Sequence, residues 1–290
     1  MKKIFILGNP RSGTSLLRIM LNCHPEIAAP PECGFLQWWF SKYTNWTDKD
    51  IFNGRIDDYL TDLFSSRKFE TWSVDKFQFK KHLIKEQPSN YTELTTEVYK
   101  FWGKKSTTIP QVIIDKNNYY IHHLNELKQV WPDAGYILLI RDGRDVACSY
   151  KRMQELDTDS PYKPNLSNEI DIIAKEWKGN NERIISFLEK VHSKKYISVR
   201  YEDLIEQSQR VLRDICHFLG LKYNSQMLNY YKRNQADEIE PKETLDWKKK
   251  TLRKPDKRNV GKYKDILEEE DIRVFNDIAG RTLKRFNYSS

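Results

Sequence analysis

Residues 8–15 read GNPRSGTS and combine two glycines, one arginine and three hydroxyl side chains. The glycines and the last hydroxyl match the nucleotide-triphosphate loop GxxxxGK[ST], but Thr14 stands where that loop has its lysine. Backbone N–H groups and a helix N-terminus can still cradle a phosphate here, although the group that reaches β- and γ-phosphates is missing. Arg11 can offer a forked donor to one phosphate and its leaving oxygen. The stretch indicates an anion-binding loop, with an ordinary strand-to-helix turn as the alternative.

A second stretch with the same potential is residues 136–152, which read YILLIRDGRDVACSYKR. Arg141 ends the apolar run, and Ser149 lies eight residues later, in the helix that should follow. A cation at a strand end and a hydroxyl on the neighbouring helix can converge on one phosphate. The alternative is that Arg141 forms an ion pair with Asp142 or Asp145.

The elements that must position these stretches alternate between apolar strands and amphipathic helices. We expect strands at residues 4–7, 112–115, 136–141 and 196–201, and helices from residue 14, over 122–131, from residue 144 and over about 206–219, ending at Gly220. Nearly continuous apolar strands between helices are typical of a parallel sheet covered on both faces. The sequence therefore predicts an α/β fold, a central parallel sheet flanked by helices, with ligands at the carboxyl ends of the strands.

Residues 37–108 differ from the rest because they are rich in aromatic residues and lysine and lack a convincing strand. We expect a helical insertion that roofs the site and supplies contacts to an acceptor molecule. The chain shows no internal repeat, low-complexity tract or linker. Residues 1–290 are therefore predicted to form a single domain.

Charge and composition narrow the class of protein. The formal net charge is +8, and 39% of the 290 residues are hydrophobic, which fits a globular protein attracted to anions. Much of the basic excess lies in residues 247–262, which favours a specific anion site over a diffuse field. A non-catalytic module that binds nucleic acid or an anionic membrane through this run is an alternative, but it does not explain the two phosphate motifs; we expect no nucleic-acid partner.

Cysteines and apolar runs exclude several further classes. The four cysteines, Cys23, Cys33, Cys148 and Cys216, are scattered without a CxxC pair, so we expect buried thiols rather than disulfides or a zinc site. No window approaches the roughly 18 apolar residues of a membrane span. The apolar run at residues 4–7 is too short for a secretory signal. The expectation is a cytoplasmic protein without a membrane span.

The two phosphate motifs, in this order, resemble those of the sulfotransferase family, which uses 3′-phosphoadenosine 5′-phosphosulfate (PAPS) and releases 3′,5′-adenosine bisphosphate (PAP). The resemblance continues through VIIDKNN at residues 112–118, VRYEDL at 199–204 and RNVGKY at 258–263. The PRSGT form of the loop is similar to tyrosylprotein, carbohydrate and bacterial sulfotransferases. The resemblance implies sulfuryl transfer to a hydroxyl acceptor, which could be a glycan, a tyrosine or a small molecule.

The resemblance also implies roles for individual residues. Arg11, Ser12, Gly13, Thr14 and Ser15 would hold the 5′-phosphosulfate, Arg141 and Ser149 the 3′-phosphate, and Tyr201 would form a wall of the nucleotide site. Arg258 and Gly261 would close over the 3′-phosphate. Tyr263 stands where the family often has tryptophan, and Lys257 or Lys262 could supply the charge instead; a solvated basic face is the other interpretation.

Sulfuryl transfer needs cations at the leaving group and a base at the acceptor. Related enzymes carry a lysine after the strand that ends at residue 115, so Lys116 joins Arg11 as a candidate cation; the alternative is a surface pair with Asp115. By resemblance Glu32 is the general base, with a pKa raised by partial desolvation. His24, His122 and His123 are its rivals.

Metal dependence separates the main hypothesis from an alternative of the same architecture. A sulfonate carries less charge than a phosphate, so no magnesium is expected to be required. The alternative is a P-loop kinase-like phosphotransferase in which Asp115 is the magnesium carboxylate.

Overall fold

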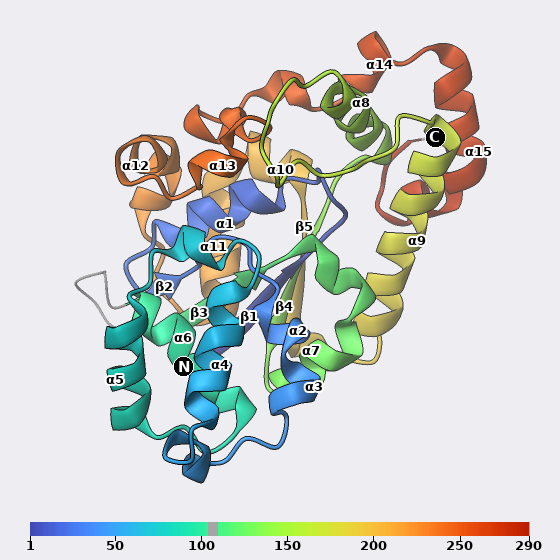
Figure 1. The fold of residues 1–290 in the computed structure, drawn as a ribbon. Helices are drawn as coiled ribbons and strands as arrows, with labels where there is room; N and C mark the ends of the chain where they lie inside the picture. The colour runs from blue at the N-terminus through green and yellow to red at the C-terminus, as the bar shows by residue number, and fades with distance from the viewer. Residues whose placement is uncertain (104–109, 290) are drawn as a thin grey trace.

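The core of the molecule is a five-stranded parallel sheet. The computed structural model describes residues 1–103 and 110–289. The strands are β1 (Lys2–Leu7), β2 (Ile27–Ala28), β3 (Val112–Lys116), β4 (Gly135–Ile140) and β5 (Tyr196–Arg200), in the order β2-β3-β1-β4-β5. Every neighbouring pair is parallel. The predicted α/β fold with a parallel sheet flanked by helices is confirmed (Figure 1).

Alternate residues of each strand enter two different hydrophobic cores. In β1, Phe5 and Leu7 belong to one core, and Ile4 and Ile6 belong to the other. The same alternation in β3 sends Ile113 to the first core, with Val112 and Ile114 on the opposite face. This follows from the two-residue period of a strand.

One face of the sheet is covered by the helix that follows the glycine loop and by helices that follow β5. They are α1 (Thr14–Asn22), α10 (Tyr201–Glu206), α11 (Ser208–Leu219) and α12 (Tyr230–Asp237). The helix predicted over about 206–219 corresponds to α11, which begins two residues later. The strand predicted to reach Tyr201 stops one residue earlier, and α10 follows it directly. As predicted, α11 ends at Gly220, whose φ of 73° is accessible to glycine without strain.

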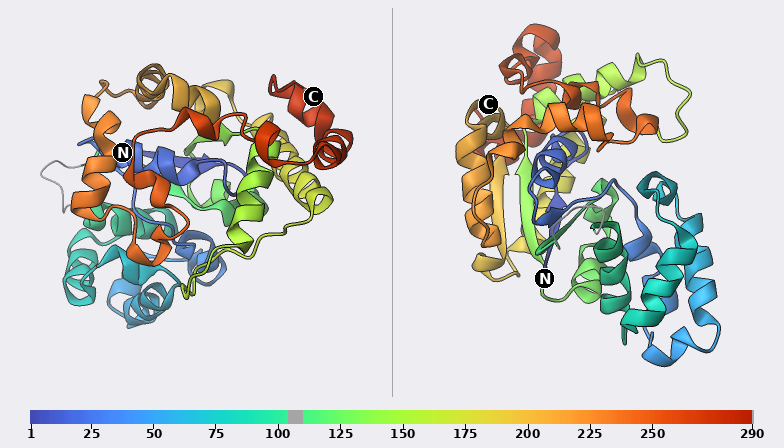
Figure 2. Two further views of the ribbon diagram at one scale, coloured as in Figure 1. Left: turned by 90° about the horizontal axis from the view of Figure 1, so that it is seen from above. Right: turned by 90° about the vertical axis from the view of Figure 1, so that its left-hand side faces the viewer.

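The other face is covered by four further helices. They are α7 (Leu124–Val130), α8 (Gly143–Gln154), α9 (Ile170–Leu188) and α15 (Glu269–Arg285). The group of helices between β2 and β3 packs on the same core and stands beside the sheet in Figure 2. Its members are α2 (Phe35–Trp38), α3 (Phe40–Tyr43), α4 (Arg55–Ser65), α5 (Lys76–Glu86) and α6 (Tyr91–Gly103), with the 3-10 helices η1 (Asp48–Ile51) and η2 (Phe69–Trp72).

The stretch expected to be a helical insertion, residues 37–108, contains these elements up to residue 103. Its last five residues, 104–108, lie outside the described part of the chain. No strand interrupts residues 37–103. This segment therefore forms a helical layer of its own against the first core.

Short elements connect the rest of the chain. They are η3 (Asn118–His122), η4 (Ser193–Lys195), η5 (Ser225–Asn229), α13 (Lys242–Leu245), η6 (Lys249–Leu252), η7 (Lys257–Asn259) and α14 (Tyr263–Ile266). Among the described residues, no helix is long and apolar enough to cross a membrane. Cys23, Cys33, Cys148 and Cys216 are all buried and free, as predicted.

Candidate functional site

The glycine loop between β1 and α1 is shaped by contacts that exclude side chains. A Cβ on Gly8 would lie 2.4 Å from the carbonyl oxygen of Leu139. Gly13 caps α1 with a φ of 95°, and a Cβ there would lie 2.5 Å from the ring of Tyr201. Both contacts are too close for any larger residue. The two glycines therefore let the loop lie flat against β4 and against the start of α10.

Arg11 has a left-handed backbone with a φ of 68°, which costs a non-glycine residue on the order of 1 kcal/mol. Its Nε donates to Ser149 Oγ at 3.0 Å, and its other guanidinium N–H donates to the carbonyl of Trp247 at 3.0 Å. Burial, and then the charge of Arg141, lower the pKa of Arg11 to about 10, which keeps it protonated at neutral pH. The side chain thus extends toward α8 and the C-terminal basic run.

Arg141 lies beside this guanidinium at the carboxyl end of β4. It donates to the carbonyl of Arg11 at 3.2 Å and to that of Asn259 at 2.7 Å, and it lies 4.3 Å over the ring of Tyr201. The nearest carboxylate oxygen recorded for it, on Asp145, is 3.9 Å away. The alternative of a pair with Asp142 is wrong, because Asp142 pairs with Arg144. We call Arg11, Arg141 and Ser149 the Arg141 cluster.

The glycine loop and the Arg141 cluster each contain a buried hydrogen-bond donor without a partner, which bears on whether a phosphate would fit there. Arg141 Nε and Ser12 Oγ are buried and have no hydrogen-bond partner within residues 1–103 and 110–289. Buried donors without partners are rare and costly, so their presence here calls for an acceptor. Anionic oxygens match these donors and the surrounding charge.

The C-terminal basic run reaches the Arg141 cluster, but not through Arg258. That side chain is 91% exposed and pairs with Asp256 at 2.9 Å, so the expected contact of Arg258 with the 3′-phosphate site is absent from this arrangement. The backbone N–H of Gly261 instead donates to Asp145 at 2.8 Å and anchors the run. The predicted position of Gly261 beside the cluster is retained.

Two lysines of the same run, Lys250 and Lys262, are influenced by the charge of the Arg141 cluster. Burial, and then the charge of Arg141, lower the pKa of Lys262 to about 8. Burial and the charges of Arg152, Arg141 and Arg11 also lower the pKa of Lys250. Lys262 was an alternative in the sequence, whereas Lys250 was missed, since nothing in the run KKK distinguishes its last member.

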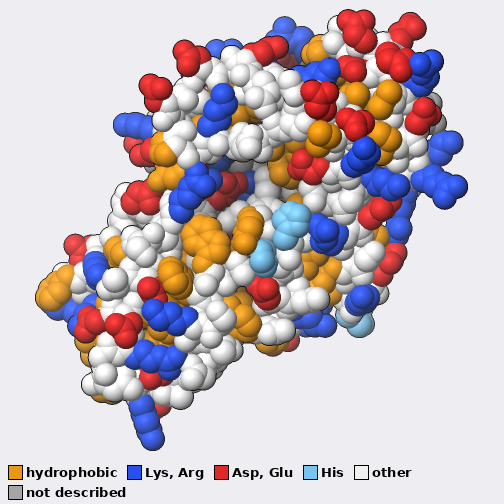
Figure 3. All heavy atoms as spheres, turned by 45° about the vertical axis from the view of Figure 1, so that its right-hand side comes forward, with side chains coloured by type: hydrophobic (Ala, Val, Ile, Leu, Met, Phe, Trp, Pro, Cys, Tyr) orange, Lys and Arg blue, Asp and Glu red, His pale blue; other side chains and the backbone are white. Residues whose placement is uncertain are grey.

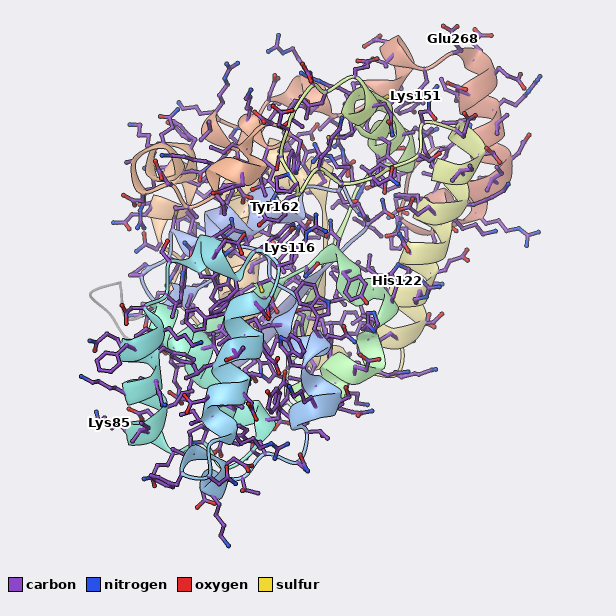
Figure 4. The ribbon with its side chains drawn as sticks, viewed as in Figure 1. Lys85, Lys116, His122, Lys151, Tyr162 and Glu268 are labelled. Atoms are coloured by element: carbon purple, nitrogen blue, oxygen red, sulfur yellow. The ribbon has the colours of Figure 1, made fainter. Side chains whose placement is uncertain are left out.

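A second charged cluster lies at the carboxyl end of β3. Lys116 is buried; its Nζ lies 3.3 Å from Ser15 Oγ and donates to Glu32 Oε1. The other carboxylate oxygen of Glu32 accepts from Lys68, which comes from the helical layer, at 3.1 Å. We call Ser15, Glu32, Lys68 and Lys116 the Lys116 cluster. It joins the glycine loop to the acceptor side through one ammonium group, and Figure 4 shows Lys116 near the centre of the molecule.

Thr14, the residue that replaces the loop lysine, is also held from β3. Its hydroxyl lies 3.2 Å from Asn118 Oδ1, two residues after Lys116. The loop and the end of β3 are therefore tied at Thr14 and at Ser15. These contacts orient the first turn of α1.

The electrostatics of Glu32 differ from the expectation. Burial alone raises its pKa, but the charges of Lys116, Lys248 and Lys68 together hold it well below its usual range. The predicted raised pKa is therefore wrong, because three ammonium groups outweigh desolvation. Burial lowers the pKa of Lys116 to about 8, with Glu32 opposing that shift.

Asp115 cannot join the Lys116 cluster because it is the preceding residue of the same strand. It faces the first core, where Tyr120 donates to its carboxylate at 2.6 Å. Burial raises its pKa to about 6. The alternatives that Asp115 pairs with Lys116 or provides a magnesium carboxylate at the loop are both wrong. No group of three His, Cys, Asp or Glu suited to a metal occurs among the described residues.

The three histidines make other contacts. His24 accepts the N–H of Glu26 at 3.1 Å, a local capping role. His122 lies 3.0 Å from a guanidinium nitrogen of Arg183, and His123 lies 3.2 Å from Glu126. In Figure 4, His122 lies to the side of Lys116, toward α9. The arrangement favours Glu32 over these rivals.

Residues 155–169 form a connection that the sequence did not single out. It leaves α8, extends toward the helical layer and returns to enter α9 (Figure 2). Tyr162 lies under the cations of Arg67 and Lys68, 5.2 and 5.6 Å from its ring centre. Thr158 donates to Asp246 at 2.6 Å. The connection therefore links the helical layer to Asp246, the residue before the C-terminal basic run. Figure 3 shows a hollow on one face of the molecule with hydrophobic, charged and histidine side chains around it.

Comparison with known proteins assigns the chain to a family. Residues 3–225 match the model of the Sulfotransferase family. Since this is well over half of the chain, the protein belongs to the sulfotransferase family and is an enzyme of that family.

Two curated relatives show how far the likeness extends. A putative protein-tyrosine sulfotransferase of Caenorhabditis briggsae is 22% identical over 287 residues, which are 95% of this chain and 85% of that protein. Protein-tyrosine sulfotransferase 1 of Danio rerio is 24% identical over 79% of this chain but only 56% of its own length. The chain thus spans little more than half of the zebrafish relative.

Solved structures share the fold at similarly low identity. The sulfotransferase domain of the Synechococcus PCC 7002 olefin synthase is 22% identical, covers 100% of this chain and 96% of its own, and has a TM-score of 0.63. Mouse sulfotransferase SULT7A1, complexed with PAP, is 16% identical over 98% of this chain and 89% of its own, with a TM-score of 0.50. At these identities the likeness establishes the fold.

Proposed function

We propose that this enzyme transfers the sulfuryl group of PAPS to a hydroxyl-bearing acceptor. The observation that carries the proposal is the position of Lys116, whose single buried ammonium contacts both Ser15 of the glycine loop and Glu32. A donor group held by the loop and an acceptor hydroxyl at Glu32 would meet at this cation. A relative complexed with PAP supports the choice of nucleotide.

The fit of the nucleotide follows from the orphan donors. The loop residues Arg11, Ser12, Gly13, Thr14 and Ser15 would hold the 5′-phosphosulfate through backbone N–H groups and hydroxyls. The Arg141 cluster, with Lys250 and Lys262, would hold the 3′-phosphate, and Tyr201 would flank it. When bound, PAPS supplies an activated sulfuryl group whose departure leaves charge on a phosphate oxygen.

The chain's own groups then have separate tasks. Lys116 would stabilise the negative charge that develops on the leaving oxygen, as a preorganised donor in a buried site does. Glu32 would accept the proton of the acceptor hydroxyl, and its low pKa keeps it ionised and ready. An anion bound against Lys116 competes for the ammonium, which raises the basicity of Glu32.

The acceptor would enter from the hollow between the helical layer and residues 155–169. Lys68, which holds Glu32, and Tyr162, which lies beside Lys68, are on this side. Aromatic and basic side chains there suit a phenolic, sugar or small-molecule hydroxyl. The names of the tyrosine-modifying relatives favour including tyrosine peptides in the test.

Isothermal titration calorimetry tests the donor half of the proposal. We expect PAP to bind tightly without magnesium. Magnesium-dependent binding of ATP, with no binding of PAP, would refute the proposal. A screen with labelled PAPS against tyrosine peptides, oligosaccharides and small phenols then identifies the acceptor by transfer of label.

A further inference from the structure

Lys248 is a buried lysine that the family resemblance did not single out. Only 9% of its side chain is exposed, and its Nζ donates to Glu240 Oε1. The preceding residue, Trp247, receives the guanidinium of Arg11 on its carbonyl at 3.0 Å. The backbone that carries Lys248 is therefore attached directly to the glycine loop.

Glu240, the partner of Lys248, is itself held rigidly. Its second carboxylate oxygen lies 2.5 Å from the guanidinium of Arg18, and both side chains are at most 2% exposed. Thr244 Oγ1 lies 2.6 Å from Glu240 Oε1, and the Glu240 backbone N–H donates to Asn234 at 2.7 Å. Glu240 is therefore a fixed, ionised anchor for the ammonium of Lys248.

The anchor is attached to the helix that presents the loop. Arg18 lies on α1 three residues after Ser15, so the two side chains share one face of that helix. Ser15 faces Lys116, and Arg18 faces Glu240. Lys248 is therefore held, through Glu240 and Arg18, at the face of α1 that also carries Ser15 of the Lys116 cluster.

The charge of Lys248 also acts on the Lys116 cluster. Its charge is the third-largest influence on the pKa of both Glu32 and Lys116. The contact from Arg11 to the carbonyl of Trp247 and the pair between Arg18 and Glu240 hold Lys248 beside the glycine loop. This is the end of the loop where the sulfuryl group would lie.

We propose that Lys248 is a further substrate-contacting cation of this enzyme, which binds the sulfonate end of PAPS together with Lys116 and is positioned by Glu240. The inference rests on the proposed function. A sulfonate placed between two ammonium groups gains charge-assisted hydrogen bonds that PAP, which lacks the sulfonate, cannot form. Lys248 therefore discriminates donor from product.

Titration of two nucleotides against paired variants tests this role. In Lys248→Met we expect the Kd for PAPS to rise about tenfold while the Kd for PAP changes by less than about twofold, since one charge-assisted contact is lost only with PAPS. Lys249→Met is the control, because that side chain is 69% exposed and pairs with Asp246 at 3.2 Å. Both nucleotides should bind Lys249→Met like the wild type.

A merely structural role for Lys248 predicts a different pattern. Equal weakening of PAPS and PAP, or no change in either, would overturn the inference. Glu240 keeps Arg18 in Lys248→Met, so its charge stays paired; if the variant nevertheless fails to fold, Lys248→Gln is measured in the same way. Lys248→Arg should recover most of the affinity for PAPS.

Failure of this inference is distinguishable from failure of the proposed function. If the wild type binds neither PAPS nor PAP, the proposed function fails. If the wild type binds both and Lys248→Met keeps the wild-type ratio of the two Kd values, Lys248 is not a sulfonate contact.

Discussion

The two charged clusters of this sulfotransferase differ in how far their positive charge is neutralised. In the Arg141 cluster, guanidinium groups donate to neutral backbone carbonyls and to the hydroxyl of Ser149, and the carboxylate of Asp145 is 3.9 Å from Arg141. In the Lys116 cluster, Lys116 and Lys68 both contact the carboxylate of Glu32. The first cluster has two cations and no carboxylate of its own, whereas in the second one carboxylate is shared by two ammonium groups.

This difference suggests a division of labour. Burial, and then the charge of Arg141, lower the pKa of Arg11 to about 10 and that of Lys262 to about 8. A bound anion relieves the repulsion between these cations. Binding energy is therefore concentrated at the Arg141 cluster. A cluster whose cations already pair with a carboxylate binds a further anion less strongly. Its carboxylate can instead take up a proton during the transfer reaction.

Replacing Glu32, the proposed base, should have the largest effect and should separate the roles of the two clusters. In Glu32→Gln we expect turnover to fall by about a thousandfold, since general bases contribute about 10²–10⁴. Binding of PAP should stay within about threefold of wild type, because Glu32 lies on the acceptor side of Lys116. Turnover is measured as release of PAP from PAPS with the acceptor that the screen identifies.

Glu126→Gln is the control for loss of a carboxylate, since Glu126 pairs with His123 away from the loop. It should turn over like the wild type. Near-normal turnover in Glu32→Gln would remove Glu32 from the role of base and return the histidines to consideration.

The next largest effect is expected on binding at the Arg141 cluster. Arg141→Ala should raise the Kd for PAP roughly a hundredfold, about 2.8 kcal/mol, because two charge-assisted hydrogen bonds are lost. Arg258→Ala is the matched control and should leave the Kd unchanged, because that side chain is 91% exposed and pairs with Asp256. Equal losses in the two variants would mean that the C-terminal run rearranges around the nucleotide and that the resemblance placed Arg258 correctly.

Sequence reasoning located the backbone of the site well because local patterns determine it. The glycine loop, Arg141 and Lys116 all follow apolar strands, and parallel strands bring their carboxyl ends to one edge of the sheet. The alternation of β3 also explains why Lys116 reaches the loop and Asp115 does not. Applied to that strand, the period of two could have separated these neighbours from the sequence alone.

Side-chain partners from distant segments were beyond such reasoning. Lys68 reaches Glu32 from the helical layer, 36 residues away, and Lys248 is selected from a run of three lysines by the buried Glu240. Neither contact produces a periodic pattern in the amino-acid sequence. The pKa of Glu32 was predicted in the wrong direction for the same reason, since its sign depends on these lysines. The cytoplasmic location and the single domain stay predictions.

A smaller effect should follow from removing the outer lysine of the Lys116 cluster. In Lys68→Met we expect turnover near neutral pH to change by less than about threefold, since Lys116 still holds Glu32. The pKa of Glu32 should rise, because one of the ammonium groups that lower it is lost. Turnover is lost as the pH falls through that pKa, so the acid limb of the pH profile should move to higher pH.

The alkaline limb of the same profile serves as the internal control. It should reflect Lys116, whose pKa is about 8, and turnover should fall as the pH rises through that value. Lys68 and Lys116 contact different oxygens of Glu32, so this limb should stay in place. An unmoved acid limb, or a shift of both limbs, would contradict the assignment of Glu32 to the acid side.

The smallest effect is expected at Asp115, on the other face of β3. Its folded pKa of about 6 lies above its unfolded value, so the protonated form is favoured by folding. The stability that it contributes is complete below about pH 4 and is lost as the pH rises through about 6. In Asp115→Asn this pH dependence should disappear, while the amide oxygen can still accept from Tyr120. Thermal unfolding between pH 4 and pH 7 measures the difference.

Turnover of Asp115→Asn should stay within about twofold of wild type, because the side chain faces the hydrophobic core and not the glycine loop. A magnesium carboxylate at this position would instead make the variant inactive. If the variant loses turnover while its stability is unchanged, Asp115 must take part in the reaction. That result would contradict the separation of Asp115 from Lys116. Retained turnover with a flattened pH dependence of stability would locate the chemistry on the Lys116 face alone.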